Sequence, residues 1–385
     1  MAASEELGII GVDSFHYFVR NPERSRVFYE HGFGWRPLVR AGAKLVADTG
    51  QASTVYQSGD VRVVVSTPES DSCRAARYLK RHPAGIGSVT FSVEDLDRTW
   101  NFLANRGATP IHPIVETRED GGRFRHFSIT TAIGDVAFRF LQRTDYSGFA
   151  PGFESVELDP AQRAPTLGFK KVDHITNNAP TMAPVKLWFE HVLGLEQCWE
   201  IEFHTNDLNP TGANSSGTGL KSVVMWDPRS GMKFPINEPL QPFFKEGQIN
   251  TFVEDNAGAG IQHIALEVED CAGAVKSLRE HDVAFLQTPG SYYDAAPARL
   301  AKKSVDVTKL AHKMDQLREL GILIDGQPEN RYLIQIFLQD AATFYSEPEA
   351  GPFFYELIQR CGDPGFGEGN FRALFEAIER DKVTA

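Results

Sequence analysis

Two histidines and one glutamate are candidate metal ligands, because each lies in a short apolar run that is typical of a strand. They are His174 in a Val-Asp-His segment, His263 in an Ile-Gln-His segment and Glu356 in a Phe-Tyr-Glu segment. Two imidazoles and one carboxylate on one face of a metal ion leave the opposite face open, which is the ligand set of non-heme Fe(II) oxygenases. The three residues are separated by 89 and 93 positions, so only the tertiary fold could bring them together.

The segments that must position these ligands belong to a unit that occurs twice. Residues 11–35 align without a gap with residues 171–195, and both predict a strand, a loop, an amphipathic helix and a terminal glycine. A second match pairs residues 86–95 with 261–270, and a third pairs 142–143 with 359–360. Helices are predicted to follow the second match at residues 96–106 and 272–281. The repeat therefore predicts a duplicated scaffold.

The first copy of the repeat lacks the candidate ligands. At the three aligned positions it has Ser14, Ser88 and Arg139. Two hydroxyls and a positive guanidinium cannot replace two imidazoles and a carboxylate around iron. We therefore expect one metal site per chain, in the C-terminal half.

The repeat predicts the fold class α+β, with duplicated βαβββ modules that pair into two half-barrel domains. Ligands would point inward from strands, where alternate side chains share a face. The N-terminal domain is predicted to span residues 8–150 without metal ligands, and the C-terminal catalytic domain residues 165–385, with residues 144–168 as a linker. The amphipathic residues 370–380, which follow a glycine-rich stretch, predict a C-terminal helix that closes over the site as a lid.

Composition excludes several classes of protein. The chain of 385 residues is long enough for two domains, and its net charge of −12 argues against a nucleic-acid partner. The four cysteines form no CxxC pair and predict reduced thiols in a cytoplasmic protein. No apolar run approaches the ~18 residues of a membrane span, and the N-terminus lacks the basic start of a secretory signal. We therefore expect neither a nucleic-acid nor a membrane partner.

Several longer segments resemble the 4-hydroxyphenylpyruvate dioxygenase family of the vicinal oxygen chelate superfamily. In the order that this family has them, the segments are FKKVDHITNN, FPINEP, GAGIQHIAL, YLIQIF, FFYELIQR and GFGEGNFRALFEAIE. The resemblance implies a glyoxalase-like fold with Fe(II) on His174, His263 and Glu356. Two departures are that GQIN replaces a more usual SQIQ and that Tyr355 stands where an aliphatic residue is common.

The resemblance also implies which side chains surround the substrate. The polar positions are Ser222, Asn237, Gln262 and Gln335. The aromatic positions are Phe337, Phe354, Phe366 and Phe371. Neutral polar groups can orient a substrate without adding charge to a dry site, and phenyl rings supply flat apolar walls.

The activity implied by this resemblance is the conversion of 4-hydroxyphenylpyruvate, an aromatic α-keto acid, and O₂ to homogentisate and CO₂ in tyrosine breakdown. The main alternative is 4-hydroxymandelate synthase, which hydroxylates the benzylic carbon of the same substrate; the bulky Phe337, Phe354 and Phe371 favour attack on the ring. An extradiol ring-cleaving dioxygenase and a non-catalytic ligand-binding protein are further alternatives. The YLIQIF and GFGEGNF segments argue against the former, and the complete ligand set against the latter. The family also implies a homo-oligomer, a dimer or a tetramer.

Overall fold

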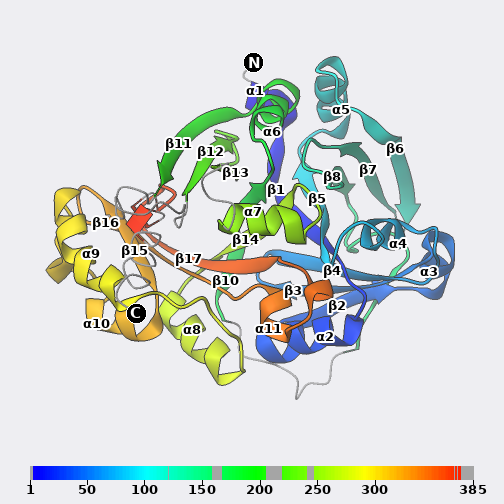
Figure 1. Ribbon diagram of the computed structural model, residues 1–385. Coiled ribbons are helices and arrows are strands. Elements are labelled where there is room, and N and C mark those ends of the chain that lie inside the picture. The colour runs from blue at the N-terminus through cyan, green and yellow to red at the C-terminus, as the bar shows by residue number, and fades with distance from the viewer. Residues whose placement is uncertain are drawn as a thin grey trace.

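The computed structural model describes residues 3–119, 121–157, 167–204, 219–240, 247–367, 369–370 and 372–373. Its strands form two curled sheets, one from each half of the chain (Figure 1). This duplicated α+β architecture confirms the predicted fold class. Most of the lid helix predicted over residues 370–380 lies outside the described residues.

The N-terminal half consists of two βαβββ modules. Its strands are β1 (Ile9–Phe18), β2 (Arg36–Ala41), β3 (Gln51–Ser58), β4 (Val61–Pro68), β5 (Gly85–Val93), β6 (Pro110–Glu119), β7 (Gly122–Thr130), β8 (Ala137–Thr144) and the short β9 (Phe153–Ser155). Its helices are α1 (Ala3–Leu7), α2 (Pro22–Val27), η1 (Phe28–Gly32), α3 (Ala43–Thr49), α4 (Arg74–Leu79) and α5 (Leu96–Asn105). The strand order in the sheet is β6-β7-β8-β5-β1-β4-β3-β2-β9.

The C-terminal half repeats this arrangement. Its strands are β10 (Phe169–Asn178), β11 (Glu196–His204), β12 (Gly219–Trp226), β13 (Lys233–Pro239), β14 (Gly260–Val268), β15 (Leu323–Gln327), β16 (Arg331–Phe337) and β17 (Phe354–Cys361). Its helices are α6 (Ala183–Trp188), η3 (Phe189–Leu193), α7 (Gln248–Asp255), α8 (Cys271–Glu280), α9 (Gly290–Lys302), η5 (Val307–Lys309), α10 (Met314–Leu320), α11 (Ala341–Tyr345) and η6 (Pro348–Ala350). The order β15-β16-β17-β14-β10-β13-β12-β11 matches the first sheet strand for strand, apart from β9.

The registers of the central strands make the two halves equivalent residue by residue. On β14, Ala265 lies opposite both His174 of β10 and Glu356 of β17. The corresponding residues of the first half, in the same order, are Thr90, Ser14 and Arg139. The strand pairings therefore reproduce the alignment of the sequence repeat.

Bulges occur at the same places in both central strand pairs. Between β10 and β14 the pairing skips Asp173 and Gln262, and between β1 and β5 it skips Asp13 and Gly87. A bulge redirects the side chain of the extra residue and is common beside functional sites. In both halves, the residue before each of the two histidine positions is therefore displaced from regular strand geometry, whereas the pairing through Glu356 and Arg139 is regular.

The two helices that were predicted to follow the second repeat match are present as α5 and α8. Each of them ends one residue before the predicted position. Their starts are fixed by aspartates: Asp95 accepts hydrogen bonds from the backbone N–H groups of Asp97 and Arg98, and Asp270 accepts one from that of Gly273. An N-cap carboxylate satisfies backbone donors that the first turn of a helix leaves unpaired. The repeated Val-Glu-Asp motif is thus the end of a strand followed by a helix cap.

The second half differs from the first by an insertion between α8 and β15, which contains α9, η5 and α10. On α9, the Tyr292 hydroxyl donates to Oδ1 of Asn370 at 2.6 Å, and Arg299 donates to the carbonyl oxygen of Gly369 at 2.6 Å. The insertion therefore anchors the chain just before the C-terminal segment.

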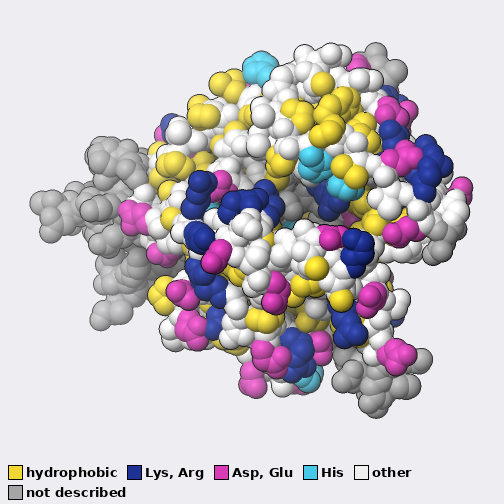
Figure 2. Space-filling model, turned by 90° about the vertical axis from the view of Figure 1, so that its right-hand side faces the viewer, with side chains coloured by type: hydrophobic (Ala, Val, Ile, Leu, Met, Phe, Trp, Pro, Cys, Tyr) yellow, Lys and Arg dark blue, Asp and Glu magenta, His cyan; other side chains and the backbone are white. Residues whose placement is uncertain are grey.

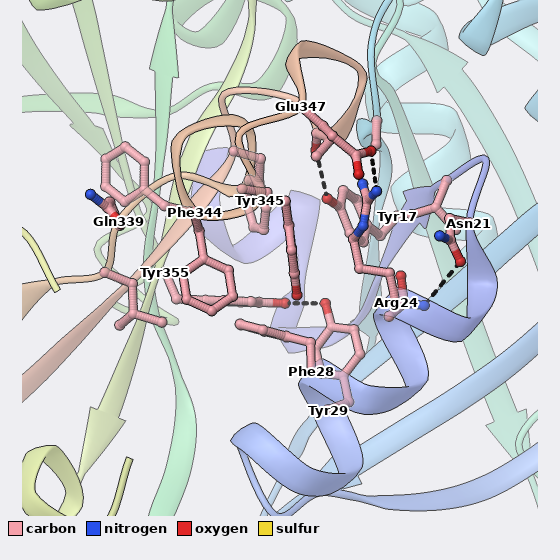
Figure 3. A pocket seen from close by; sticks show the side chains of 18 of the residues that line it. Tyr17, Asn21, Arg24, Phe28, Tyr29, Gln339, Phe344, Tyr345, Glu347 and Tyr355 are labelled. Atoms are coloured by element: carbon pink, nitrogen blue, oxygen red, sulfur yellow. Dashed lines mark hydrogen bonds and ion pairs between the residues drawn. The ribbon is translucent and has the colours of Figure 1, made fainter. Parts of the chain in front are cut away.

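The two halves meet around a cavity of about 180 Å³ between α2 and η1 on one side and α11, η6 and β17 on the other (Figure 3). In Figure 3 the hydroxyls of Tyr29 and Tyr355 point toward one another, and they form a hydrogen bond of 2.8 Å. Arg24 of α2 forms an ion pair with Glu347 at the edge of the cavity. Tyr355, the residue that departs from the family pattern, thus connects the second half to the first.

The surface shows no strong segregation of charge on the face drawn in Figure 2. Acidic and basic side chains are interspersed there among hydrophobic and neutral polar ones. None of the described helices is both long and apolar enough to cross a bilayer.

Candidate metal centre

Three neighbouring strands of the second sheet, β10, β14 and β17, each contribute one candidate ligand. His174, His263 and Glu356 are exposed by only 1%, 5% and 2%, and one ligand atom from each lies within 4.8 Å of the others. Oε2 of Glu356 is 3.1 Å from Nε2 of His174 and 3.3 Å from Nε2 of His263. The fold therefore brings together three side chains that are far apart in the sequence, with their ligand atoms converging.

Unpaired polar atoms in this group fit a bound cation. Oε1 of Glu356 is buried without a hydrogen-bond partner among the described residues, and the buried Nε2 of His263 has only the 3.3 Å approach of Oε2 of Glu356. A buried polar atom without a partner costs about 1–3 kcal/mol, and a metal ion would remove this cost. Two imidazoles and a carboxylate could hold such an ion and leave its remaining coordination positions to other ligands.

The pKa shifts follow from burial and from the mutual charges of the three groups. Burial disfavours the carboxylate of Glu356, but the two histidines outweigh it and hold the pKa of Glu356 below its ordinary value. Burial likewise disfavours imidazolium in His174, but the Glu356 and Asp173 carboxylates outweigh it and raise the pKa of His174. In His263 burial prevails and lowers the pKa, so this imidazole presents a lone pair.

Each histidine is held at its other ring nitrogen by the bulged residue that precedes it. Oδ1 of Asp173 lies 2.9 Å from Nδ1 of His174, and Oε1 of Gln262 lies 3.1 Å from Nδ1 of His263. Arg360 fixes Asp173 in turn with hydrogen bonds of 2.6 and 2.8 Å. Such partners orient the imidazole and set the tautomer that leaves Nε2 available to a metal.

Three of the four predicted polar substrate contacts lie on the face of the sheet that bears the ligands. Ser222 of β12 lies opposite Asn237 of β13. Gln335 of β16 shares a face with Phe337, which lies opposite Glu356. Oγ of Ser222, Oδ1 of Asn237 and Oε1 of Gln335 are all buried without a described partner, so each is available to a polar ligand. Gln262 differs, because its side chain contacts His263.

Comparisons with known proteins identify the family. The model of the glyoxalase/bleomycin resistance protein/dioxygenase superfamily matches residues 11–135 and 171–297, one stretch in each half. A protein named 4-hydroxyphenylpyruvate dioxygenase from Caenorhabditis briggsae is 33% identical, over 97% of this chain and 92% of its own length. Its namesake from Dictyostelium discoideum is 30% identical, over 97% and 98%. This chain belongs to the 4-hydroxyphenylpyruvate dioxygenase family.

The fold of this family member is also similar to that of a solved structure. A triple mutant of 4-hydroxymandelate synthase from Streptomyces coelicolor superimposes with a TM-score of 0.76 at 25% identity, covering 97% of this chain and 99% of that one. The two-half architecture is therefore shared along the entire length of both proteins.

Aromatic rings surround the two histidines in this family member. The ring of Phe366 meets that of His174 edge-on, with centroids 4.6 Å apart, and Phe354 stacks on His263 at 5.0 Å. Phe337 lies 5.8 Å from His263. These rings can keep water from the ligands and form apolar walls. Phe371, the fourth predicted aromatic position, lies outside the described residues.

Asp173 and Arg360 were not among the residues predicted for the site. The signal that could have found them is the repeat, because the first half has Asp13 and Arg143 at the corresponding positions and they also form an ion pair. A pair retained in both halves indicates a structural link across the sheet. In the second half, the same link also reaches His174.

Proposed function

We propose that this chain is an Fe(II)-dependent 4-hydroxyphenylpyruvate dioxygenase, which converts 4-hydroxyphenylpyruvate and O₂ to homogentisate and CO₂. The observation that carries the proposal is the buried group of His174, His263 and Glu356, beside polar atoms that have no partner. The names of relatives that match nearly the whole chain support the same activity.

The three ligand side chains would hold Fe(II), which supplies the activation of dioxygen and of the α-keto acid when bound. The chain itself binds and orients the substrate. Ser222, Asn237 and Gln335 would satisfy their unpaired atoms on the polar groups of the substrate without adding charge. Phe337 and Phe354 would confine the aromatic ring, and Phe366 would shield His174 from water.

The closest competing activity is benzylic hydroxylation of the same substrate, as the name of the 4-hydroxymandelate synthase structure suggests. The decisive experiment is to load the purified protein with Fe(II), supply 4-hydroxyphenylpyruvate and O₂, and identify the product by mass spectrometry and NMR. We expect homogentisate and one CO₂ for each O₂ consumed. 4-Hydroxymandelate as the main product would overturn the assignment, and binding of the substrate without oxygen uptake would indicate a non-catalytic protein.

The identity of the metal needs a separate measurement. The same protein should be stripped and reloaded in parallel with Fe(II), Mn(II) and Zn(II), and the metal content and oxygen uptake measured for each. We expect one metal per chain and turnover with Fe(II). Equal turnover with Zn(II), which has no redox chemistry, would contradict an iron-dependent oxygenase.

We further propose that residues 8–150 and 165–385 are two domains, that the chain forms a homo-oligomer and that it works in the cytoplasm. The duplicated sheets support the division into domains, and the cysteine content of the sequence supports a reducing compartment. Limited proteolysis would test the domain limits, light scattering after gel filtration the oligomeric state, and cell fractionation the location. Cleavage first inside either sheet, a monomeric mass or recovery with a membrane fraction would each contradict its part of the proposal.

A further inference from the structure

A second cavity, of about 330 Å³, lies in the first half, at the place that corresponds to the metal centre of the second. The counterparts of the three metal ligands line it: they are Ser14, Ser88 and Arg139. This half does not take part in the proposed reaction, so the cavity has no assigned role.

The surroundings of this cavity carry an excess of positive charge that the metal centre lacks. Asp13 is its one lining carboxylate among the described residues, and it is paired with Arg143 and, at 3.5 Å, with Arg62. Arg139 adds a third positive charge. In the metal centre, by contrast, the two carboxylates of Asp173 and Glu356 are balanced by Arg360 and by Lys233, which lies near Asp173. A site with this excess of positive charge favours an anion where its counterpart favours a cation.

Arg139 is the group that most needs a partner. Its Nε is buried without a hydrogen bond, and within the described part of the chain no carboxylate oxygen lies within 4.0 Å of its guanidinium. Burial lowers the pKa of Arg139 to about 10, although Asp13 opposes the shift, so the side chain stays charged at neutral pH. Arg139 as a whole is only partly exposed. A charge withdrawn from water without a counter-ion is unfavourable, and a bound anion would reduce that penalty.

The remaining walls suit an anion with an apolar body. His16 is a neutral imidazole, because burial and the nearby Arg74 and Arg139 lower its pKa to about 3, so it contributes a polar ring without a charge. Phe124 and Phe149 also line the cavity, each with its ring beside the guanidinium of Arg143. Phenyl rings next to a cationic fork can hold both ends of a small carboxylic acid at once.

We propose that this cavity is a second ligand site, which binds a small organic carboxylate through a paired hydrogen bond to the guanidinium of Arg139. The planar fork of arginine matches the two oxygens of a carboxylate. The site uses residues of the first half alone, so it is independent of the metal and of the proposed reaction.

The test uses 4-bromobenzoate as the probe, because bromine can be located by anomalous diffraction. Crystals of the metal-loaded protein and of the Arg139→Gln and Arg36→Gln variants should be soaked in it. Arg36 is an exposed arginine of β2 outside the cavity, so its variant controls for the loss of one charge. We expect a bromine peak in the cavity of the wild type and of Arg36→Gln, and none there in Arg139→Gln.

Titration of 4-fluorobenzoate followed by ¹⁹F NMR gives the corresponding affinities in solution. Arg139→Gln should weaken binding in the first half at least tenfold, and Arg139→Lys, which keeps the charge but loses the fork, should also weaken it. Circular dichroism establishes that each variant is folded; if Arg139→Gln is not, the lysine variant decides. Bromine at the metal centre alone, unchanged affinity in a folded variant, or binding of sulfate but not of benzoate would each overturn the proposal.

Discussion

His263 and Ser88 occupy the same place in the two halves, on β14 and β5, but only the histidine can bind a metal. We expect His263→Ala to reduce the metal content from one ion per chain to almost none. The loss of affinity should exceed the roughly 10–100-fold that removal of an outer partner costs. Ser88→Ala should retain one ion per chain. Metal analysis after dialysis measures both, and a large loss of metal in the serine variant would contradict a metal site confined to the second half.

The carboxylate behind His174 provides a more sensitive test of how the ligands are oriented. Asp173→Asn removes the charge that faces Nδ1 of His174 and Arg360, and should weaken metal binding about 10–100-fold. Asp13→Asn is the matched control, because Asp13 has the same place and the same type of arginine partner in the first half. Competition with a chelator gives both affinities. Equal effects of the two substitutions would show that the loss comes from general destabilisation.

That His174, His263 and Glu356 converge could be predicted from sequence, because the two halves differ at these positions while the flanking residues match; that they bind a metal stays a prediction. The outer partners Asp173 and Arg360 were missed, because they are the same in both halves and a difference between the halves does not mark them; only their retention in both copies could have drawn attention to them. Gln262 was expected to contact the substrate, and this prediction is untested; its position at a bulge instead puts its side chain against His263. Strand alternation alone does not predict that direction.

Between elements, the Tyr29–Tyr355 hydrogen bond links η1 of one half to β17 of the other. Replacing either tyrosine by phenylalanine leaves a buried hydroxyl without this partner, and should lower the free energy of unfolding by about 1–3 kcal/mol. The double variant should lose less than the sum of the two, because no orphaned hydroxyl remains. Urea denaturation of the four proteins measures the coupling. Strictly additive losses would mean that the hydroxyls do not depend on each other.

Helices could be predicted accurately from the sequence where the residues that define them are close together in the chain. Both helices after the second repeat match were expected to within one residue, since an aspartate cap and apolar periodicity lie in the same few residues. The direction of Tyr355 was not predicted, because its partner is 326 residues away. The insertion that contains α9 and α10 also has no counterpart in the first half, so the repeat carries no information about it.

For the whole molecule, the partly buried histidine His16 predicts how the free energy of unfolding depends on pH. Its pKa is lowered from 6.5 to about 3 in the folded chain, by burial and then by Arg74 and Arg139. Below pH 6.5 the unfolded chain therefore binds a proton that the folded chain does not, and stability falls as the pH falls toward 3. The contribution is at most about 1.4 kcal/mol for each pH unit.

This contribution can be isolated with His16→Gln. The variant should lose stability less steeply than the wild type between pH 6.5 and pH 4.5, whereas the two should run parallel above pH 7.5. Denaturant unfolding at a series of pH values gives both curves. Parallel curves over the entire range would show that His16 is protonated in the folded protein.

Because neighbouring residues of β17 face opposite ways, Glu356 points to the metal ligands while Tyr355 points to the other half. We therefore expect β17 to tolerate insertions and deletions less well than the connection that precedes it. One residue added or deleted within β17 would exchange the two directions, placing a phenol among the histidines and a carboxylate among the aromatic rings at the junction. The connection at residues 340–351, a few positions earlier, contains no strand of the sheet, so a change in its length would not by itself reverse the two directions. Insertions and deletions that accumulate between relatives should thus cluster before Phe353 and be rare after it.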